Sequence, residues 1–345
     1  MKVEGQRQPT TKMNRREFLK ISAVAGGFLA GGSLLRHAAR YATQTVKEAR
    51  TLMGTVIQVT LVTPDAEQGR QVVEDTFSEI ERLVSILDHR RPQSALARLN
   101  RDGGLRAAPV DLRRVLAQAQ AYAELSEGAF DVTVLPLLKA AERGGDARAA
   151  RDLVDFRRLQ LVGDGVFLLR RDMAVTLDGI AKGYVVDCAS AMLQQRGFAN
   201  VLVEAGGDLV GYGRNGDNDP WRVGIRHPRA TAQTPYLSTL RISQQALATS
   251  GDYMNFFTQD FSQHHIVDPR RSMSPPELSS VTVLAPTAMD ADALSTTVMV
   301  LGQKAGLALL ERLPRVAGLL AGKPSEQSKL ATWRTSNLPI LDGAW

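Results

Sequence analysis

Residues 173–196 read MAVTLDGIAKGYVVDCASAMLQQR, a short run rich in apolar residues followed by a glycine-containing turn and a helical repeat. The run Met173–Leu177 predicts a short β-strand, and Lys182–Arg196 predicts a helix. Between them, Asp178–Gly183 places flexible backbone and a lysine where the strand enters the helix. This arrangement suits a pyrophosphate group, because helix N-termini attract anions. The segment has neither the spacing of a Walker loop nor that of a Gly-x-Gly-x-x-Gly motif.

Elements of both kinds flank this segment. Strands are predicted at Gly54–Val62, Val166–Leu169, Val201–Glu204, Trp221–Ile225, Leu237–Ile242 and Val281–Leu284, and helices at Val73–Leu87, Asp111–Leu125, Pro136–Arg143, Ala291–Val300 and Lys304–Leu313. Strands and helices alternate too irregularly for a doubly wound sheet, and no repeat or low-complexity linker divides the chain. We therefore expect an α+β fold with a mixed sheet, packed helices and a single catalytic unit.

The N-terminal residues resemble an export signal. Asn14–Lys20 reads NRREFLK, which is similar to the twin-arginine consensus, and an apolar run rich in glycine and alanine follows at Ile21–Leu35. That run is shorter than the roughly 20 strongly apolar residues of a transmembrane helix. We therefore expect residues 1–45 to be a twin-arginine signal with a short linker. The Tat export machinery would carry the protein to the periplasm, where the signal is cleaved.

The basic charge of the chain lies in this N-terminal segment. Through Arg40 the segment holds eight lysines and arginines and two acidic residues, so its contribution of +6 equals the net charge of the whole chain. The remaining residues are about neutral. Because no basic surface is left to neutralise phosphates, we expect no nucleic-acid partner.

The single cysteine, Cys188, excludes an intramolecular disulfide. It falls on one predicted helical face with Val185, Ala191 and Met192, which predicts a buried structural thiol.

Asp292 and Thr296 are four residues apart on a predicted helix, so a carboxylate and a hydroxyl project from one face. Hard oxygen ligands of this kind suit Mg²⁺. The alternative is that Asp292 only favours the N-terminus of a helix. The other motifs also have structural alternatives: Gly206–Asp208 is typical of a hairpin turn, Asp268–Arg270 of an ordinary turn, and Phe130 of a core position.

Six ordered segments resemble the ApbE family of FAD:protein FMN transferases. They are AFD at 129–131, GIAKGY at 179–184, AGGD at 205–208, ATSGDY at 248–253, HIVDPR at 265–270 and ADAL at 291–294. The resemblance extends from Met53 to about Gly302 and implies that residues 46–345 form an ApbE-like flavin transferase domain with a T-fold-like sheet. The twin-arginine signal and the variant LDG at 177–179 also resemble the NosX-like branch, which is associated with flavinylating a NosR-type membrane protein during nitrous oxide reductase maturation.

Members of the family take FAD as substrate, transfer its FMN half to a threonine or serine of a partner protein, and release AMP. The resemblance implies catalytic roles for His265, Lys182 and Asp292, with His265 as the base and the adjacent His264 as an alternative. The FAD contacts that it implies are Met53, Arg90, Ala129, Phe130, Asp131, Thr176, Lys182, His265 and Ile266. The Mg²⁺ ligands that it implies are the carbonyl of Gly179, Asp292 and Thr296.

Two positions depart from the usual pattern of this family. Thr176 replaces a leading carboxylate, while an acid stands two residues later at Asp178. Arg90 aligns with an aromatic residue that is expected to stack on the flavin, and a guanidinium can also stack on a π-face. Three functions therefore stay open: an FMN transferase, an Mg²⁺-dependent FAD pyrophosphatase, and an assembly factor that binds flavin without turnover.

Overall fold

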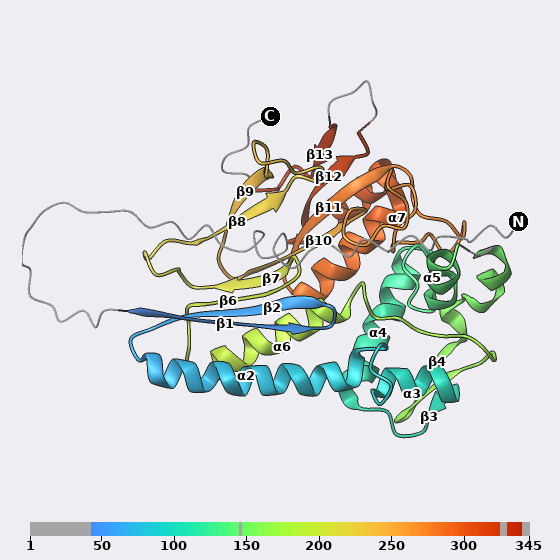
Figure 1. Cartoon of the computed structure of the whole chain (residues 1–345), viewed down its shortest axis with the longest axis horizontal. Helices are drawn as coiled ribbons and strands as arrows, with labels where there is room; N and C mark the ends of the chain where they lie inside the picture. Colours follow the sequence, from blue (N-terminus) through green and yellow to red (C-terminus); the bar gives the residue numbers. More distant parts are fainter. Residues whose placement is uncertain (1–42, 145–146, 325–329, 340–345) are drawn as a thin grey trace, which may run out of the picture. The chain divides into compact units, whose positions relative to one another are not determined.

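Eight strands form the main sheet of the structure, a computed structural model that describes residues 43–144, 147–324 and 330–339 (Figure 1). The twin-arginine signal predicted from the sequence lies outside these residues. Neighbouring strands pair antiparallel throughout. The strand order is β1 (Gln44–Leu52), β2 (Thr55–Thr63), β6 (Val201–Ala205), β7 (Asp208–Tyr212), β10 (Gln245–Gly251), β11 (Leu278–Ala285), β12 (Ala317–Gly322) and β13 (Thr332–Arg334).

Helices cover one face of this sheet and a hairpin covers the other (Figure 1). The main core lies between the sheet and the helices α2 (Ala66–Leu87), α6 (Ala181–Gln195) and α7 (Ala288–Arg312). A smaller core on the opposite face lies under β8 (Trp221–Arg226) and β9 (Tyr236–Ile242), which pair only with each other. Among the described residues, α7 is the one helix long and apolar enough to span a membrane, and most of it is buried in the domain.

Shorter elements complete the helical side. They are α3 (Ala95–Asp102), α4 (Val110–Leu125), α5 (Leu135–Glu142), the 3₁₀ helices η1 (Ala147–Leu153) and η2 (Phe156–Arg158), and a three-stranded sheet of β3 (Gly104–Leu105), β5 (Gly165–Leu168) and β4 (Leu159–Val162).

Helix boundaries follow local chemistry. The side chain of Asp65 accepts hydrogen bonds from the backbone of Glu67 and Gln68 at 3.0 Å and so caps α2. Thr287 caps α7 in the same way, through Asp290 N at 3.1 Å. Within α7, Gly302 adopts φ 80° and separates two helical parts, which agree with the two adjacent helices predicted from the sequence.

The α+β class is confirmed, and every helix predicted from periodicity is present. The prediction of a strand at Met173–Leu177 is wrong. In the structure this segment makes one isolated β-bridge, between Ala174 and Val134, and is not a strand of any sheet described. The Asn100 side chain takes the place of a neighbouring strand, because it binds both the N–H and the carbonyl of Val175, at 2.7 and 2.8 Å. A side chain thus satisfies backbone groups that would otherwise need a strand partner.

The α6–α7 crossing depends on a glycine. A Cβ added at Gly183 would lie 2.1 Å from the carbonyl oxygen of Ala288 and 2.6 Å from Met289 N, and these are backbone atoms that cannot rotate away. The α6 residue Asp187 reinforces the crossing, since its carboxylate accepts both N–H groups at the start of α7, at 2.8 and 2.9 Å.

We expect Gly183→Ala to destabilise the domain by about 1–3 kcal/mol, the usual cost of overpacking a core. For a domain of this size the melting temperature would fall by roughly 2–5 °C. Gly216→Ala is the control, because its Cβ would meet only Thr45 Oγ1, at 3.3 Å. Equal melting temperatures for the two variants, measured by circular dichroism, would show that the helices separate without cost.

Candidate active site

Two tight turns and two helices meet at one end of the main sheet. The β1–β2 turn consists of Met53 and Gly54, with φ 52° and 73°, and the β6–β7 turn of Gly206 and Gly207, with φ 62° and 105°. The turns touch, since a Cβ at Gly206 would lie 2.2 Å from Thr55 Oγ1. Positive φ at both central residues is the geometry of two-residue hairpins, which explains the glycines. Met53, one of the predicted FAD contacts, therefore lies at this end of the sheet.

Lys182 is the centre of a buried ionic cluster. Its ammonium lies 2.8 Å from Asp208 Oδ2 and 3.4 Å from Asp292 Oδ2, and it donates to the carbonyl of Asp178 at 3.0 Å. The lysine comes from the first turn of α6, Asp208 follows the β6–β7 turn, and Asp292 comes from the first half of α7. The backbone N–H of Gly183 also donates to Asp292 Oδ2, at 3.1 Å.

Two carboxylates share one ammonium in this cluster, and both carboxylates are almost fully buried. Burial raises the pKa of Asp292, and the nearby Asp208 raises it further. Although burial acts against it, the attraction of Asp208 and Asp292 holds the pKa of Lys182 above its usual range. The cluster therefore has one more acidic group than basic groups, and a cation would be stabilised beside it.

Gly179 and Thr296 lie beside this cluster. A Cβ at Gly179 would come within 2.9 Å of Thr296 Oγ1 and 3.4 Å of a ring carbon of Phe130, so the backbone here approaches both side chains closely. Thr296 follows Asp292 by one helical turn, and its hydroxyl is 3.1 Å from that of Ser250 in β10. The three Mg²⁺ ligands implied by the resemblance thus come from two neighbouring segments.

These oxygen donors fit Mg²⁺. The described residues hold no group of three or more His, Cys, Asp or Glu side chains suited to a metal. A carboxylate, a hydroxyl and a backbone carbonyl beside an acidic cluster are the hard ligands that Mg²⁺ takes, with the rest of its octahedron left to water and substrate phosphate.

The two adjacent histidines differ in environment. His264 is fully buried, and its Nε2 contacts the carbonyl of Pro275 at 3.5 Å. The ring of His265 is half-buried, and its Nδ1 contacts the carbonyl of Asn255 at 3.2 Å. A carbonyl can only accept, so this contact assigns the proton of neutral His265 to Nδ1 and leaves Nε2 with a lone pair.

Both histidines are held neutral. Burial lowers the pKa of His264 to about 3 and that of His265 to about 4. The charges of Asp178, Lys182 and Arg90 also act on the pKa of His265. The ring of His265 is partly exposed whereas that of His264 is fully buried, so exposure favours His265 for contact with a substrate.

Asp178 forms a bidentate ion pair with Arg90. The two guanidinium nitrogens lie 2.8 and 2.6 Å from the two carboxylate oxygens, and His89 Nε2 lies 3.4 Å from Oδ2. Against the effect of burial, hydrogen bonds from His89 and Arg90 hold the pKa of Asp178 well below its usual range. One departing position, Arg90, is therefore in direct contact with Asp178, the acid that stands two residues after the other departing position, Thr176.

The remaining predicted FAD contacts are mostly buried. The carboxylate of Asp131 accepts hydrogen bonds from Thr133 N at 2.8 Å, from the Thr133 hydroxyl at 2.6 Å and from Phe156 N at 3.0 Å, so it anchors its own loop. Thr176 Oγ1 accepts a hydrogen bond from Asp178 N at 3.2 Å. It therefore stabilises the turn at Asp178, whose carbonyl also accepts from Lys182. Ala129, Phe130 and Ile266 belong to the main core.

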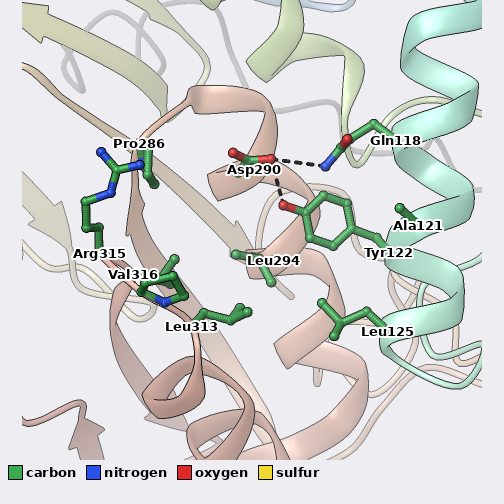
Figure 2. Close-up of a pocket in the computed structure, with 11 residues that line it drawn as sticks. Gln118, Ala121, Tyr122, Leu125, Pro286, Asp290, Leu294, Leu313, Arg315 and Val316 are labelled. Carbon is green, nitrogen blue, oxygen red and sulfur yellow. Dashed lines mark hydrogen bonds between the residues drawn. The ribbon is translucent and has the colours of Figure 1, made fainter.

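A cavity of about 440 Å³ lies on another face of α7, between α4 and the loop that precedes β12 (Figure 2). Asp290 points into it and accepts hydrogen bonds from Tyr122 at 2.7 Å and Gln118 at 3.3 Å. Asp290 and Asp292 are two residues apart, so they point to different sides of the helix. The cavity is separate from the ionic cluster, and none of the predicted site residues lines it.

Cys188 is free and half-buried, and it packs against the main core. Burial raises the pKa of its thiol to about 11, which keeps the thiol protonated and agrees with the structural role predicted for it.

Asp208 is the site residue that sequence reasoning missed. It belongs to the motif AGGD at 205–208, which predicted a hairpin turn, and it does close that hairpin by pairing with Ala205. Its carboxylate is also the nearest partner of Lys182. The available signal was an acidic side chain directly after the turn, within a motif that resembles the family pattern.

Comparison with known proteins identifies the family of this chain. Residues 53–320 match the ApbE family. The chain is 31% identical over 323 residues to a protein named FAD:protein FMN transferase from Treponema pallidum, with 85% of this chain and 89% of that protein covered. Among solved structures, the flavin transferase ApbE from Vibrio cholerae has a TM-score of 0.72 at 28% identity, covering 85% of this chain and 98% of that one. The apbe protein from Thermotoga maritima has a TM-score of 0.74 at 25% identity, covering 85% and 97%. The chain therefore belongs to the ApbE family.

Proposed function

We propose that this protein is an Mg²⁺-dependent FAD:protein FMN transferase that acts on a threonine or serine of a partner protein. The observation that carries the proposal is the meeting of Lys182, Asp208, Asp292 and Thr296 at one end of the sheet. Family membership and the shared name of its curated relatives support the same activity.

The reaction replaces the phosphoanhydride bond of FAD with a phosphoester bond to the acceptor. The acceptor hydroxyl oxygen forms a bond to the FMN phosphorus, the bond from that phosphorus to the bridging oxygen of the pyrophosphate breaks, and AMP leaves with the bridging oxygen. His265 Nε2 takes the proton of the hydroxyl, for which its neutral state and fixed tautomer are suited. The charged Lys182 stabilises negative charge that develops on the departing phosphate.

Asp292, Thr296 and the carbonyl of Gly179 would hold the magnesium ion. Bound there, it would supply charge neutralisation for the pyrophosphate oxygens. Asp208 keeps Lys182 in place at 2.8 Å, a shorter distance than either contact of the lysine with Asp292, so Asp292 is the carboxylate more available to a metal.

We further propose that the reaction takes place in the periplasm and that a NosR-type membrane protein is the acceptor. The NRREFLK signal at 14–20 supports export, and the LDG variant at 177–179 supports the NosX-like branch. Export in the folded state would allow FAD to be loaded before transit. Finding the FAD site empty in freshly exported protein would count against that last step.

The test is to incubate the protein with FAD, Mg²⁺ and a candidate acceptor domain, and to separate the products on a denaturing gel. We expect flavin fluorescence on the acceptor band, with AMP released in equal amount. An acceptor whose candidate threonine or serine is replaced by alanine is the control and should stay dark. Release of AMP and free FMN without labelled acceptor would indicate a pyrophosphatase, and intact bound FAD an assembly factor.

A further inference from the structure

The Arg90–Asp178 ion pair connects two loops at the candidate active site. Arg90 lies in the turn between α2 and α3, and Asp178 lies directly before α6. The paired contacts of 2.8 and 2.6 Å fix the plane of the guanidinium, since a bidentate carboxylate permits one orientation. On the Arg90 side, the backbone N–H donates to Asp88 at 3.0 Å, which holds the base of the side chain as well.

Asp178 also belongs to the peptide that carries the rest of the site. Its carbonyl accepts the Lys182 ammonium, its N–H donates to Thr176, and the next residue is Gly179. The position of the Asp178 side chain is therefore linked through its own backbone to Lys182 and to a proposed Mg²⁺ ligand.

The pair adds little to the stability of the fold. The side chain of Arg90 is 52% exposed and that of Asp178 is 31% exposed. Ion pairs with this much exposure make small contributions to folding. The Asn100–Val175 hydrogen bonds already join α3 to the segment before Asp178. What the pair adds is a fixed, half-exposed guanidinium plane beside the turn whose carbonyl holds Lys182.

We propose that Asp178 is a positioning residue that holds the Arg90 guanidinium for the flavin half of FAD, so that the pair sets the affinity for this substrate. This inference rests on the proposed function. A guanidinium held in one plane can stack on an aromatic ring system such as isoalloxazine, whereas a lysine ammonium cannot. Fixing the plane in advance reduces the ordering that FAD binding requires.

The test uses the full-length chain with Asp178→Asn, Arg90→Lys, Arg90→Ala and the double variant Arg90→Ala/Asp178→Asn. FAD binding is followed by quenching of flavin fluorescence, and transfer by steady-state kinetics. We expect each single change to raise both the Kd and the KM for FAD about tenfold, because a charge-assisted bidentate contact is lost. We expect kcat to change less than threefold and the melting temperature to stay within a few degrees.

The double variant should bind FAD no more weakly than the weaker single variant, because the two residues act as one unit. Arg101→Ala is the control: this arginine is 57% exposed and pairs with its own neighbour Asp102, so its loss tests the effect of charge alone. We expect its Kd to stay unchanged.

Three outcomes would overturn the inference: a Kd within twofold of wild type for Asp178→Asn, wild-type binding by Arg90→Lys, or fully additive effects in the double variant. If Asp178→Asn fails to fold, Arg90→Lys still tests whether the planar guanidinium is needed, and wild-type binding by that variant would overturn the inference. Equilibrium binding needs no acceptor protein. Unchanged binding therefore counts against the role of Asp178, while a lack of transfer by wild-type protein counts against the proposed function.

Discussion

Asp292→Asn is expected to lower FMN transfer by on the order of 10³-fold, because the carboxylate that would hold Mg²⁺ loses its charge. A metal ion contributes several kcal/mol to the stabilisation of developing charge, and each 1.36 kcal/mol corresponds to a factor of about ten in rate. Asparagine keeps the shape of the side chain and an oxygen that can still accept from the backbone N–H of Gly183. The fold should therefore survive, and the measurement is single-turnover transfer at saturating FAD over a range of Mg²⁺ concentrations.

The same Asp292→Asn change that lowers transfer should not lower the stability of the metal-free protein. Since burial and Asp208 raise the pKa of Asp292, its charged form costs stability; this cost builds up as the pH rises from the ordinary carboxyl pKa to the raised one and is complete above it. Removing the charge leaves Lys182 and Asp208 as a balanced pair. Without metal we expect the melting temperature of Asp292→Asn at pH 8 to equal or exceed that of the wild type. The increase produced by Mg²⁺ with FAD should be lost, since a ligand stabilises only a state that binds it.

Asp290→Ala is the matched control on the same helix. It removes a carboxylate that contacts Tyr122 and Gln118 on a different face, so transfer and its Mg²⁺ dependence should be retained (Figure 2). Equal loss of transfer in both variants would mean that damage to α7, rather than loss of a ligand, explains the effect. Full activity of Asp292→Asn would contradict the metal assignment.

Helices were predictable from the sequence because their periodicity is strong. Val73, Phe77, Ile80, Val84 and Leu87 recur at steps of four and three, and all five are buried in α2. Such spacing survives in any tertiary context in which one helical face packs against a core. The helix begins at Ala66, earlier than the predicted start at Val73, and Asp65 caps its N-terminus.

Several strands were missed because their residues carry little β signal. β10 reads QALATSG and β12 reads AGLLAG, and both are rich in small residues with low strand propensity. They form strands because they lie in the interior of the sheet, where both faces are covered. β1 was missed for the opposite reason: it reads QTVKEARTL and forms an exposed edge with charged side chains.

The site was predictable where its members share one element. The four-residue spacing of Asp292 and Thr296 on a helix needed no tertiary information. The contact of Lys182 with Asp208 depends instead on how the β6–β7 turn meets the start of α6, and that of Arg90 with Asp178 on how two loops approach. Pairings between distant segments of this kind are set by packing, which a single sequence does not show.

His265→Ala is expected to lower transfer to the acceptor by about 10²–10⁴-fold, the usual contribution of a general base. FAD binding should change little, because the ring nitrogen that would act on the hydroxyl is free in the structure and the other one contacts the carbonyl of Asn255. The measurement is the rate of AMP release and of acceptor labelling, with the Kd for FAD determined in parallel.

His264→Leu is the matched control. The ring of His264 is fully buried, and leucine suits such a position, so this variant should keep transfer even if its stability falls. Normal transfer by His265→Ala, together with loss in His264→Leu, would reverse the assignment. Loss of FAD binding in His265→Ala would instead indicate that the histidine holds the substrate.

The pH profile gives an independent check on the same residue. A base must be neutral to accept a proton, and burial lowers the pKa of His265 to about 4. Protonation of His265 should therefore not lower the rate of transfer from pH 8 down to about 5. It should lower the rate only as the pH approaches 4. The quantity to measure is kcat/KM for FAD, since it reports groups of the free enzyme, with circular dichroism to show that the fold persists. An acidic limb centred near 6.5, the value of an exposed imidazole, would mean that the proton is taken by a group outside this buried site.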